Sequence, residues 1–182
     1  MENTIQLHDK KFRIMIPAEQ IDKAVDAVAQ RINADYAGKE TPLFLGILNG
    51  SFMFMSDLIK KIEFQNELSF VKLASYDGTC STGCVKSLIG LNNPIEGRHV
   101  IIVEDIVDTG HSMDFLYRQF QARGARSLRL AVLVDKNERR EVPVTSHFVG
   151  FTLPSGFVVG YGLDYAESYR ELPAIYEAEI EE

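Results

Sequence analysis

The chain contains 182 residues, 46% of them hydrophobic and 25% charged, and its formal net charge is −7 at pH 7. We expect a single globular domain over residues 1–182, long enough to bury a substantial core. The acidic balance argues against nucleic-acid binding over a broad surface, because phosphate contacts need basic side chains. No apolar run is long enough to cross a membrane, and the N-terminal residues lack the apolar core of a signal peptide, so we expect a cytoplasmic protein.

The N-terminal part of the chain predicts a helix and then a strand–turn–helix unit. Pro17 favours the start of a helix, which continues with apolar residues on one face: Ile21, Ala24, Val25, Val28 and Ile32. Residues 43–48 form an apolar run that indicates a buried strand. The run ends at Asn49-Gly50-Ser51, where a backbone can approach a ligand closely, although Asn-Gly is also a common turn without a ligand. A second helix is predicted from the spacing of Met55, Leu58, Ile59 and Ile62.

Residues 68–75 predict another strand, and a small, polar stretch with two glycines follows from Tyr76 to Lys86. Such a stretch is typical of a flexible loop or hairpin, and we expect residues 75–86 to form a lid. The two cysteines, Cys80 and Cys84, lie within it. We expect free thiols in a reduced compartment, with a redox switch as the alternative. The four histidines do not cluster with them, which argues against a zinc site.

Residues 99–112 carry the highest density of chemically useful side chains. A β-branched apolar run, typical of a strand buried on both faces, leads into Glu104, Asp105 and Asp108 and then a Thr-Gly turn. A helix is predicted next, because Met113, Leu116, Tyr117 and Phe120 follow helical spacing. The backbone N–H groups of such a turn point beyond the helix N-terminus, which suits a phosphate. The residue types therefore indicate a ligand with phosphate, hydroxyls and a divalent cation; an acidic loop without a ligand is the alternative.

The C-terminal part predicts further strands at residues 127–134, 147–153 and 157–161, separated by a charged and exposed stretch at 137–144. Strands that alternate with helices favour an α/β fold with a central, mainly parallel twisted sheet and helices on both faces. In such a sheet, ligands bind outside the carboxyl ends of the strands. We therefore expect one site to form from the residues that follow strands at that edge: Asn49-Gly50, Glu104 to Ser112, Asp135-Lys136 and Asp164.

The stretch at 99–112 resembles the phosphoribosyl-diphosphate signature of the type I phosphoribosyltransferases, in which an apolar strand leads into an acidic pair, another acid and a Thr-Gly turn. Residues 157–165, Phe-Val-Val-Gly-Tyr-Gly-Leu-Asp-Tyr, are similar specifically to the hypoxanthine phosphoribosyltransferases of that family, as are Phe-Val-Gly-Phe at 148–151 and Arg-Glu-Leu at 170–172. The resemblance extends from Leu43 to Arg170. It implies the type I fold, with a small hood built from the N-terminal and C-terminal segments and a flexible lid.

By this resemblance, the chain is a Mg²⁺-dependent enzyme of purine salvage. It would transfer the 5-phosphoribosyl group from phosphoribosyl diphosphate to N9 of hypoxanthine, and of guanine, with release of diphosphate. The implied partners are these small molecules and other copies of the chain, in a homodimer or homotetramer. The alternatives are a regulatory RNA- or DNA-binding protein that retains the phosphoribosyl-diphosphate site, and a relative that prefers xanthine or pyrimidines. The acidic balance and the presence of Asp108 and Lys136 favour the enzyme.

The resemblance also implies a role for each matched residue. Asp108 is the catalytic residue, near N7 of the base, and Lys136 donates to the purine O6. Phosphoribosyl and 5′-phosphate binding falls to Glu104, Asp105, Asp108, Thr109, Gly110, His111 and Ser112. Purine binding falls to Lys136, Phe157, Val158 and Asp164, and diphosphate binding to Asn49, Gly50 and Arg170. Ser75 and Tyr76 belong to the lid, and the Mg²⁺ ligands are Asp164, Glu104 and Asp105.

Two positions depart from the pattern of the family. Asn49 stands where many members have Lys before the Gly of the first loop, which removes a positive charge near the leaving group. His111 stands where a Lys is common after the Thr-Gly turn. Because imidazole ordinarily changes charge between about pH 5 and about pH 8, phosphate binding is expected to depend on pH.

Overall fold

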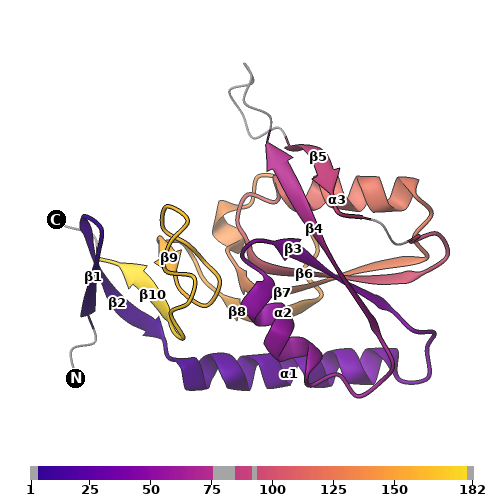
Figure 1. Ribbon diagram of the computed structural model, residues 1–182, viewed down its shortest axis with the longest axis horizontal. Helices are drawn as coiled ribbons and strands as arrows, with labels where there is room; N and C mark the ends of the chain where they lie inside the picture. Colours follow the sequence, from indigo (N-terminus) through magenta and orange to yellow (C-terminus); the bar gives the residue numbers. More distant parts are fainter. Residues whose placement is uncertain (1–3, 76–84, 92–93, 180–182) are drawn as a thin grey trace.

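The protein forms a larger and a smaller β-sheet (Figure 1), and apolar side chains from both sheets contribute to one hydrophobic core. The computed structural model describes residues 4–75, 85–91 and 94–179. The larger sheet has the order β5-β4-β3-β6-β7-β8, and all its neighbouring strands are parallel except β5, which is antiparallel to β4. Its strands are β3 (Leu43–Leu48), β4 (Glu67–Ser75), β5 (Val85–Ile89), β6 (His99–Val107), β7 (Ser127–Asp135) and β8 (Phe148–Thr152).

Helices cover both faces of the larger sheet, as the sequence predicts. Helix α1 (Ala18–Tyr36) and helix α2 (Phe52–Ile59) lie on one face, and helix α3 (His111–Ala122) lies on the other (Figure 1). The alternate side chains of β6 divide accordingly: Ile101 and Val103 pack toward α1 and α2, and Ile102 packs toward α3. The prediction of a mainly parallel sheet with flanking helices is therefore confirmed.

The two ends of the described chain meet in the smaller, antiparallel sheet. Its order is β1-β2-β10-β9, so the C-terminal strand β10 lies between an N-terminal strand and β9. The strands are β1 (Thr4–Leu7), β2 (Lys10–Ile16), β9 (Val158–Val159) and β10 (Ile175–Ala178). Phe12 is fully buried within this sheet, while Val158 and Leu163 belong to the core of the larger sheet. The smaller sheet is thus packed onto the larger one beside the ends of β6 and β7.

Several predicted bounds differ from the observed ones for local reasons. Strand β6 continues to Val107, because its pairing with β7 extends as far as the Val107–Asp135 pair. Helix α2 ends at Ile59, before Ile62, in a tighter turn where the Ile62 N–H donates to the Ile59 carbonyl. Strand β9 stops at Val159, because Gly160 has φ 99° and leaves the extended conformation.

The predicted lid is described only at its ends. Ser75 is the last residue of β4, β5 begins at Val85, and these two strands pair in antiparallel fashion. Tyr76, Cys80 and Cys84 lie outside the described residues. Among the residues that are described, no helix has the length and apolarity needed to cross a membrane.

Candidate active site

Two adjoining hollows lie where β6 and β7 end, at the predicted edge of the larger sheet. One, of about 480 Å³, is lined by residues that include Lys136, Phe157, Val158 and Asp164. The other, of about 270 Å³, is lined by residues that include Glu104, Thr109, Gly110 and Ser112. Asp108 and Ile106 line both hollows, so Asp108 lies at their junction. Residues predicted to bind the purine therefore gather on one side of Asp108, and residues predicted to bind the phosphate gather on the other.

Glu104 and Asp105 form a buried pair of carboxylates near the C-terminal end of β6. They are only 8% and 7% exposed, respectively. Backbone N–H groups bind both: Asp105 N donates to Glu104 Oε1 at 3.1 Å, and Ile106 N donates to Asp105 Oδ1 at 2.8 Å. Burial, followed by the negative charge of Asp105, raises the pKa of Glu104 well above its ordinary value. A cation or hydroxyl donors placed here would relieve this unfavourable concentration of charge.

The phosphate turn leads from β6 into α3. Gly110 is the N-cap residue, directly before α3, and has φ 94°, a left-handed conformation that favours glycine. A Cβ at Gly110 would lie 2.6 Å from the Val142 carbonyl oxygen, so the turn also needs glycine for close packing. Gly110 has no capping side chain to bind the first N–H groups of α3, which leaves these donors for a ligand. This arrangement fits the predicted 5′-phosphate site.

His111 does not line either hollow. Its Nε2 lies 2.9 Å from Glu141 Oε2, and its side chain is 48% exposed at the first turn of α3. Its effect on a phosphate would therefore come from charge at the rim of the turn, and the Glu141 carboxylate faces the same imidazole.

Arg140 is a site residue that the sequence interpretation missed. Its Nε donates to the Asp108 carbonyl at 3.2 Å, and its Nη2 pairs with the Asp135 carboxylate. In addition, the N–H groups of Glu141 and Val142 both donate to the Thr109 carbonyl, at 2.9 and 3.1 Å. The stretch expected to be exposed therefore braces the phosphate turn, and the Arg140 side chain is only 15% exposed. No local pattern distinguishes Arg140 from the adjacent, more exposed Arg139.

We expect Arg140→Met to weaken phosphoribosyl-diphosphate binding. The substitution removes the guanidinium that holds the Asp108 carbonyl, and loss of hydrogen bonds from a charged group corresponds to about 10-fold to about 100-fold in affinity. Steady-state kinetics should show the increase in KM for phosphoribosyl diphosphate. Arg118→Met, which removes an exposed guanidinium paired with Asp114 on α3, is the control. Equal KM values for the two variants would show that Arg140 does not support the turn.

Lys136 and Phe157 form the other side of the site. Lys136 is 4% exposed, and its Nζ donates to the Gly156 carbonyl at 2.7 Å, which leaves ammonium protons for a further acceptor. Burial lowers the pKa of Lys136, and the Asp108 charge opposes that shift. Phe157 is 44% exposed, and the edge of Tyr165 supports its ring at a centroid distance of 5.2 Å. A buried donor beside a supported, exposed ring suits a planar base with a carbonyl oxygen.

Arg170 and Asp164 form an ion pair close to the turn at Asn49 and Gly50. Arg170 Nη2 lies 3.0 Å from Asp164 Oδ1, and Arg170 Nη1 donates to the Gly162 carbonyl at 2.7 Å. A Cβ at Gly162 would lie 2.1 Å from the Gly50 carbonyl oxygen, so these two turns touch through their backbones. The Asn49 side chain is exposed at this turn, and the Leu48–Asn49 peptide is cis. The predicted diphosphate residues Asn49, Gly50 and Arg170 are thus neighbours, although none of them lines either hollow.

Carboxylate ligands alone do not form a complete metal site here. Within residues 4–75, 85–91 and 94–179, no three His, Cys, Asp or Glu side chains are grouped to hold an ion. Carboxylates nevertheless line both hollows: Glu104 lines the hollow beside the phosphate turn, and Asp105 and the partly exposed Asp164 line the hollow beside Lys136. Mg²⁺ commonly binds through one or two carboxylates, waters and substrate phosphates. The residues present therefore fit a magnesium ion that arrives with a phosphorylated substrate.

Comparison with known families and proteins agrees with this geometry. Residues 17–166 match the family model described as phosphoribosyl transferase domain. The chain is 42% identical over 164 residues to the hypoxanthine-guanine phosphoribosyltransferase of Streptococcus pneumoniae strain R6, with coverage of 90% of this chain and 91% of that protein. It is 41% identical over 165 residues to the protein of the same name from Bacillus subtilis strain 168, again covering 90% and 91% of the two chains.

Two further similarities extend this result. The chain is 40% identical over 170 residues to the bifunctional protein TilS/HprT of Listeria innocua, covering 93% of this chain but only 26% of that protein. The chain therefore spans about a quarter of the length of these bifunctional relatives. Among solved structures, a hypoxanthine-guanine phosphoribosyltransferase from Bacillus anthracis superposes with a TM-score of 0.84 at 40% identity, covering 90% of this chain and 96% of that one.

Proposed function

The chain belongs to the phosphoribosyltransferase family, and from that premise we propose that it catalyses purine salvage. The reaction transfers the 5-phosphoribosyl group from phosphoribosyl diphosphate to N9 of hypoxanthine or guanine and releases diphosphate. The observation that carries this proposal is the position of Asp108, which lines both the hollow beside Lys136 and Phe157 and the hollow beside the phosphate turn. A group at this junction can act where the base and the ribose are joined.

The phosphoribosyl side binds through backbone and carboxylate groups. The 5′-phosphate accepts hydrogen bonds from the N–H groups of the turn at Thr109 to Ser112 and from the hydroxyls of those two residues. Glu104 and Asp105 accept hydrogen bonds from the ribose hydroxyls, which occupy the space beside this buried pair. Arg170 meets the diphosphate, whose oxygens suit a planar guanidinium with several donors.

The purine side selects a 6-oxo group. The base lies against the exposed Phe157 ring, next to the backbone of Val158. Lys136 keeps one hydrogen bond to Gly156 and directs another proton to O6. Adenine carries a 6-amino donor at this position, so the buried ammonium would be left without an acceptor.

Asp108 acts at N7 of the base, either by accepting its proton as a general base or by accepting a hydrogen bond that orients the ring. Carboxylates near the anomeric carbon stabilise the positive character that develops as diphosphate leaves. Asp164, Glu104 and Asp105 are the residues that would hold Mg²⁺, and the ion would supply positive charge that stabilises the departing diphosphate.

We also propose the wider organisation of the enzyme. The 182 residues act as one phosphoribosyltransferase domain in which the smaller sheet forms the hood, and residues 75–86 form the lid that excludes water. The enzyme works in the cytoplasm as a homodimer or homotetramer. Its substrates are small molecules.

An absorbance assay tests the proposed function. The protein, hypoxanthine, phosphoribosyl diphosphate and Mg²⁺ are mixed, and nucleotide formation is followed in the ultraviolet. We expect turnover that stops with excess EDTA and resumes with excess Mg²⁺. Absence of turnover together with tight binding to a nucleic acid would instead favour a regulatory protein.

The His111 position predicts a pH dependence of substrate binding. A charged imidazole attracts the phosphate and a neutral one does not, so the KM for phosphoribosyl diphosphate should rise as the pH is raised from about 6 to about 8.5. The lysine of His111→Lys keeps its charge over this range, so the variant should show a smaller rise. The substrate's own titration is common to both proteins and cancels in the comparison. A flat KM in the natural protein, or an equal shift in both, would contradict the role of His111.

A further inference from the structure

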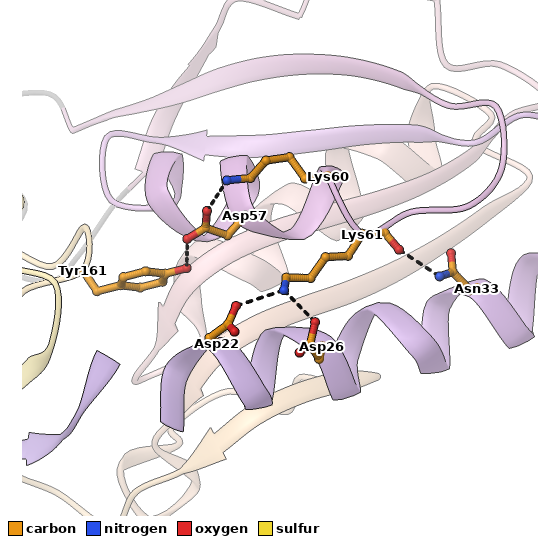
Figure 2. A network of polar contacts seen from close by, with 7 residues as sticks. All are labelled: Asp22, Asp26, Asn33, Asp57, Lys60, Lys61 and Tyr161. Carbon is orange, nitrogen blue, oxygen red and sulfur yellow. Dashed lines mark hydrogen bonds and ion pairs between the residues drawn. The ribbon is translucent and has the colours of Figure 1, made fainter. Parts of the chain in front are cut away.

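Tyr161 connects the purine end of the site to helix α2. It lies in the turn at residues 160–163, which leads from β9 toward Asp164. The side chain is 6% exposed, and its hydroxyl donates to Asp57 Oδ2 at 2.6 Å (Figure 2). Tyr161 has φ 51°, so the backbone of this turn adopts a left-handed conformation at a residue other than glycine. The Tyr161 side chain thus extends from the turn after β9 to an acceptor on α2, a helix that covers the larger sheet.

Asp57 is a fixed acceptor. Its second oxygen, Oδ1, accepts from Lys60 Nζ at 2.6 Å. Burial raises the pKa of Asp57, but the hydrogen bonds from Lys60 and Tyr161 outweigh burial and leave the pKa below its ordinary value. Burial, followed by the hydrogen bond to Asp57, raises the pKa of Tyr161, so the phenol keeps its proton and remains the donor.

The C-terminal end of α2 is in turn fixed to α1. Lys61 Nζ lies 2.6 Å from Asp26 Oδ1 and 2.9 Å from Asp22 Oδ1, and Asn33 Nδ2 donates to the Lys61 carbonyl at 2.9 Å (Figure 2). Asp57 therefore lies on a helix whose apolar face packs in the core and whose C-terminal end is joined to α1 by polar contacts. A hydrogen bond to Asp57 positions the partner, because the helix itself has little freedom to follow.

The same two parts of the fold touch through glycines near the substrate groups. The Cβ that Gly162 lacks would lie 2.1 Å from the Gly50 carbonyl oxygen, and the one that Gly50 lacks would lie 1.7 Å from Asp105 Oδ2. The turn with Tyr161, the Asn49–Ser51 turn and the buried carboxylate of β6 therefore form one close-packed stack. Since α2 begins at Phe52, directly after the middle layer of this stack, the Tyr161–Asp57 bond holds the Tyr161 turn against the Asn49–Ser51 turn.

We propose that Tyr161 is a positioning residue for the transfer reaction, acting through Asp57. This proposal rests on the proposed function. The Tyr161–Asp57 bond sets the separation between the purine-binding segment, which contains Val158 and Asp164, and the Asn49-Gly50 turn that meets the diphosphate. That separation determines how closely N9 of the base approaches the anomeric carbon, and small misplacements of reacting atoms are costly in rate.

Tyr161→Phe tests the proposal, because the ring stays buried and only the hydroxyl is lost. Loss of a hydrogen bond to a charged acceptor corresponds to about a 10-fold decrease in kcat/KM for hypoxanthine, shared between a lower kcat and a higher purine KM. The KM for phosphoribosyl diphosphate should change by less than about 2-fold, since its turns are not altered. Tyr117→Phe is the matched control, because it also removes a buried phenol hydroxyl, but one that has no hydrogen-bond partner among the described residues. The control should retain the natural constants.

Substitutions at Asp57 complete the test. Asp57→Asn keeps an acceptor oxygen for the phenol and should retain most of the activity, whereas Asp57→Ala should reproduce the effect of Tyr161→Phe. In the double variant Tyr161→Phe/Asp57→Ala the two effects should not add, since both remove the same bond. Thermal unfolding of each variant distinguishes loss of folded protein from loss of positioning. Loss of folded protein lowers kcat but leaves the purine KM unchanged.

The outcomes separate this proposal from the proposed function. A lower melting temperature with unchanged kinetic constants in Tyr161→Phe would overturn the positioning role, as would effects that simply add in the double variant. If the natural protein itself fails to turn over hypoxanthine or guanine, the proposed function is overturned instead.

Discussion

Asp108→Asn is expected to lower kcat by about 100-fold to about 10,000-fold, the range typical of a lost general base, while the Kd for phosphoribosyl diphosphate changes by less than about 3-fold. The asparagine is nearly the same size as aspartate, so the turn that follows keeps its shape. It carries no negative charge and cannot accept the N7 proton. Stopped-flow or steady-state kinetics gives kcat, and calorimetry with phosphoribosyl diphosphate and Mg²⁺ gives Kd.

The surroundings of Asp108 explain why the two effects should separate. Its Oδ1 is buried without a hydrogen-bond partner among the described residues, and its Oδ2 lies 3.2 Å from Arg139 Nη1. The backbone carbonyl, which the substitution preserves, carries the contact with Arg140. Asp114→Asn, an exchange of the same kind within α3, is the control and should leave both constants unchanged. Equal losses in kcat and in phosphoribosyl-diphosphate affinity for Asp108→Asn would argue against a role at the base.

Lys136→Ala is expected to lower kcat/KM for hypoxanthine by about 10-fold to about 100-fold, the value of a hydrogen bond from a charged donor. The discrimination between hypoxanthine and adenine should fall by a similar factor, because adenine gains nothing from the ammonium. Parallel assays with the two bases measure this ratio. Lys23→Ala, which removes an exposed lysine of α1, serves as the control.

Burial of Lys136 gives the prediction its size. The side chain is 4% exposed, so its hydrogen bonds do not compete with bulk water. The substitution also frees the Gly156 carbonyl, which accepts from Lys136 at 2.7 Å and lies next to Phe157. A general loosening of this segment would weaken the binding of all bases equally. Unchanged discrimination in Lys136→Ala would therefore remove the lysine from the recognition of O6.

The central sheet could be predicted from the sequence because its signals are local. Apolar runs of strand length alternate with helical periodicity, and the carboxyl ends of parallel strands meet at one edge whatever their order. Asp108, Lys136 and Asp164 can therefore be placed at one site from the sequence, and the three line one hollow. The extension of β6 to Val107 was not predicted, because it depends on the length of its neighbour β7.

The contacts that were missed connect residues far apart in the chain. Tyr161 and Asp57 are separated by 104 residues, and Arg140 reaches back 32 residues to Asp108. Neither pair has a spacing pattern, because each depends on where the smaller sheet or the stretch after β7 packs. The contact between Gly50 and Gly162 is of the same kind: Asn-Gly alone indicated a turn, and the packed structure gives the reason for its glycine.

Steady-state kinetics with hypoxanthine, guanine, xanthine and adenine, each with phosphoribosyl diphosphate and Mg²⁺, tests whether the site selects 6-oxopurines. We expect nucleotide formation from hypoxanthine and from guanine, and a kcat/KM for adenine that is lower by at least about 100-fold, as expected when a buried donor lacks its acceptor. Preference for adenine, or no turnover with any of the four bases, would contradict the assignment of Lys136 and Asp108 to a 6-oxopurine site.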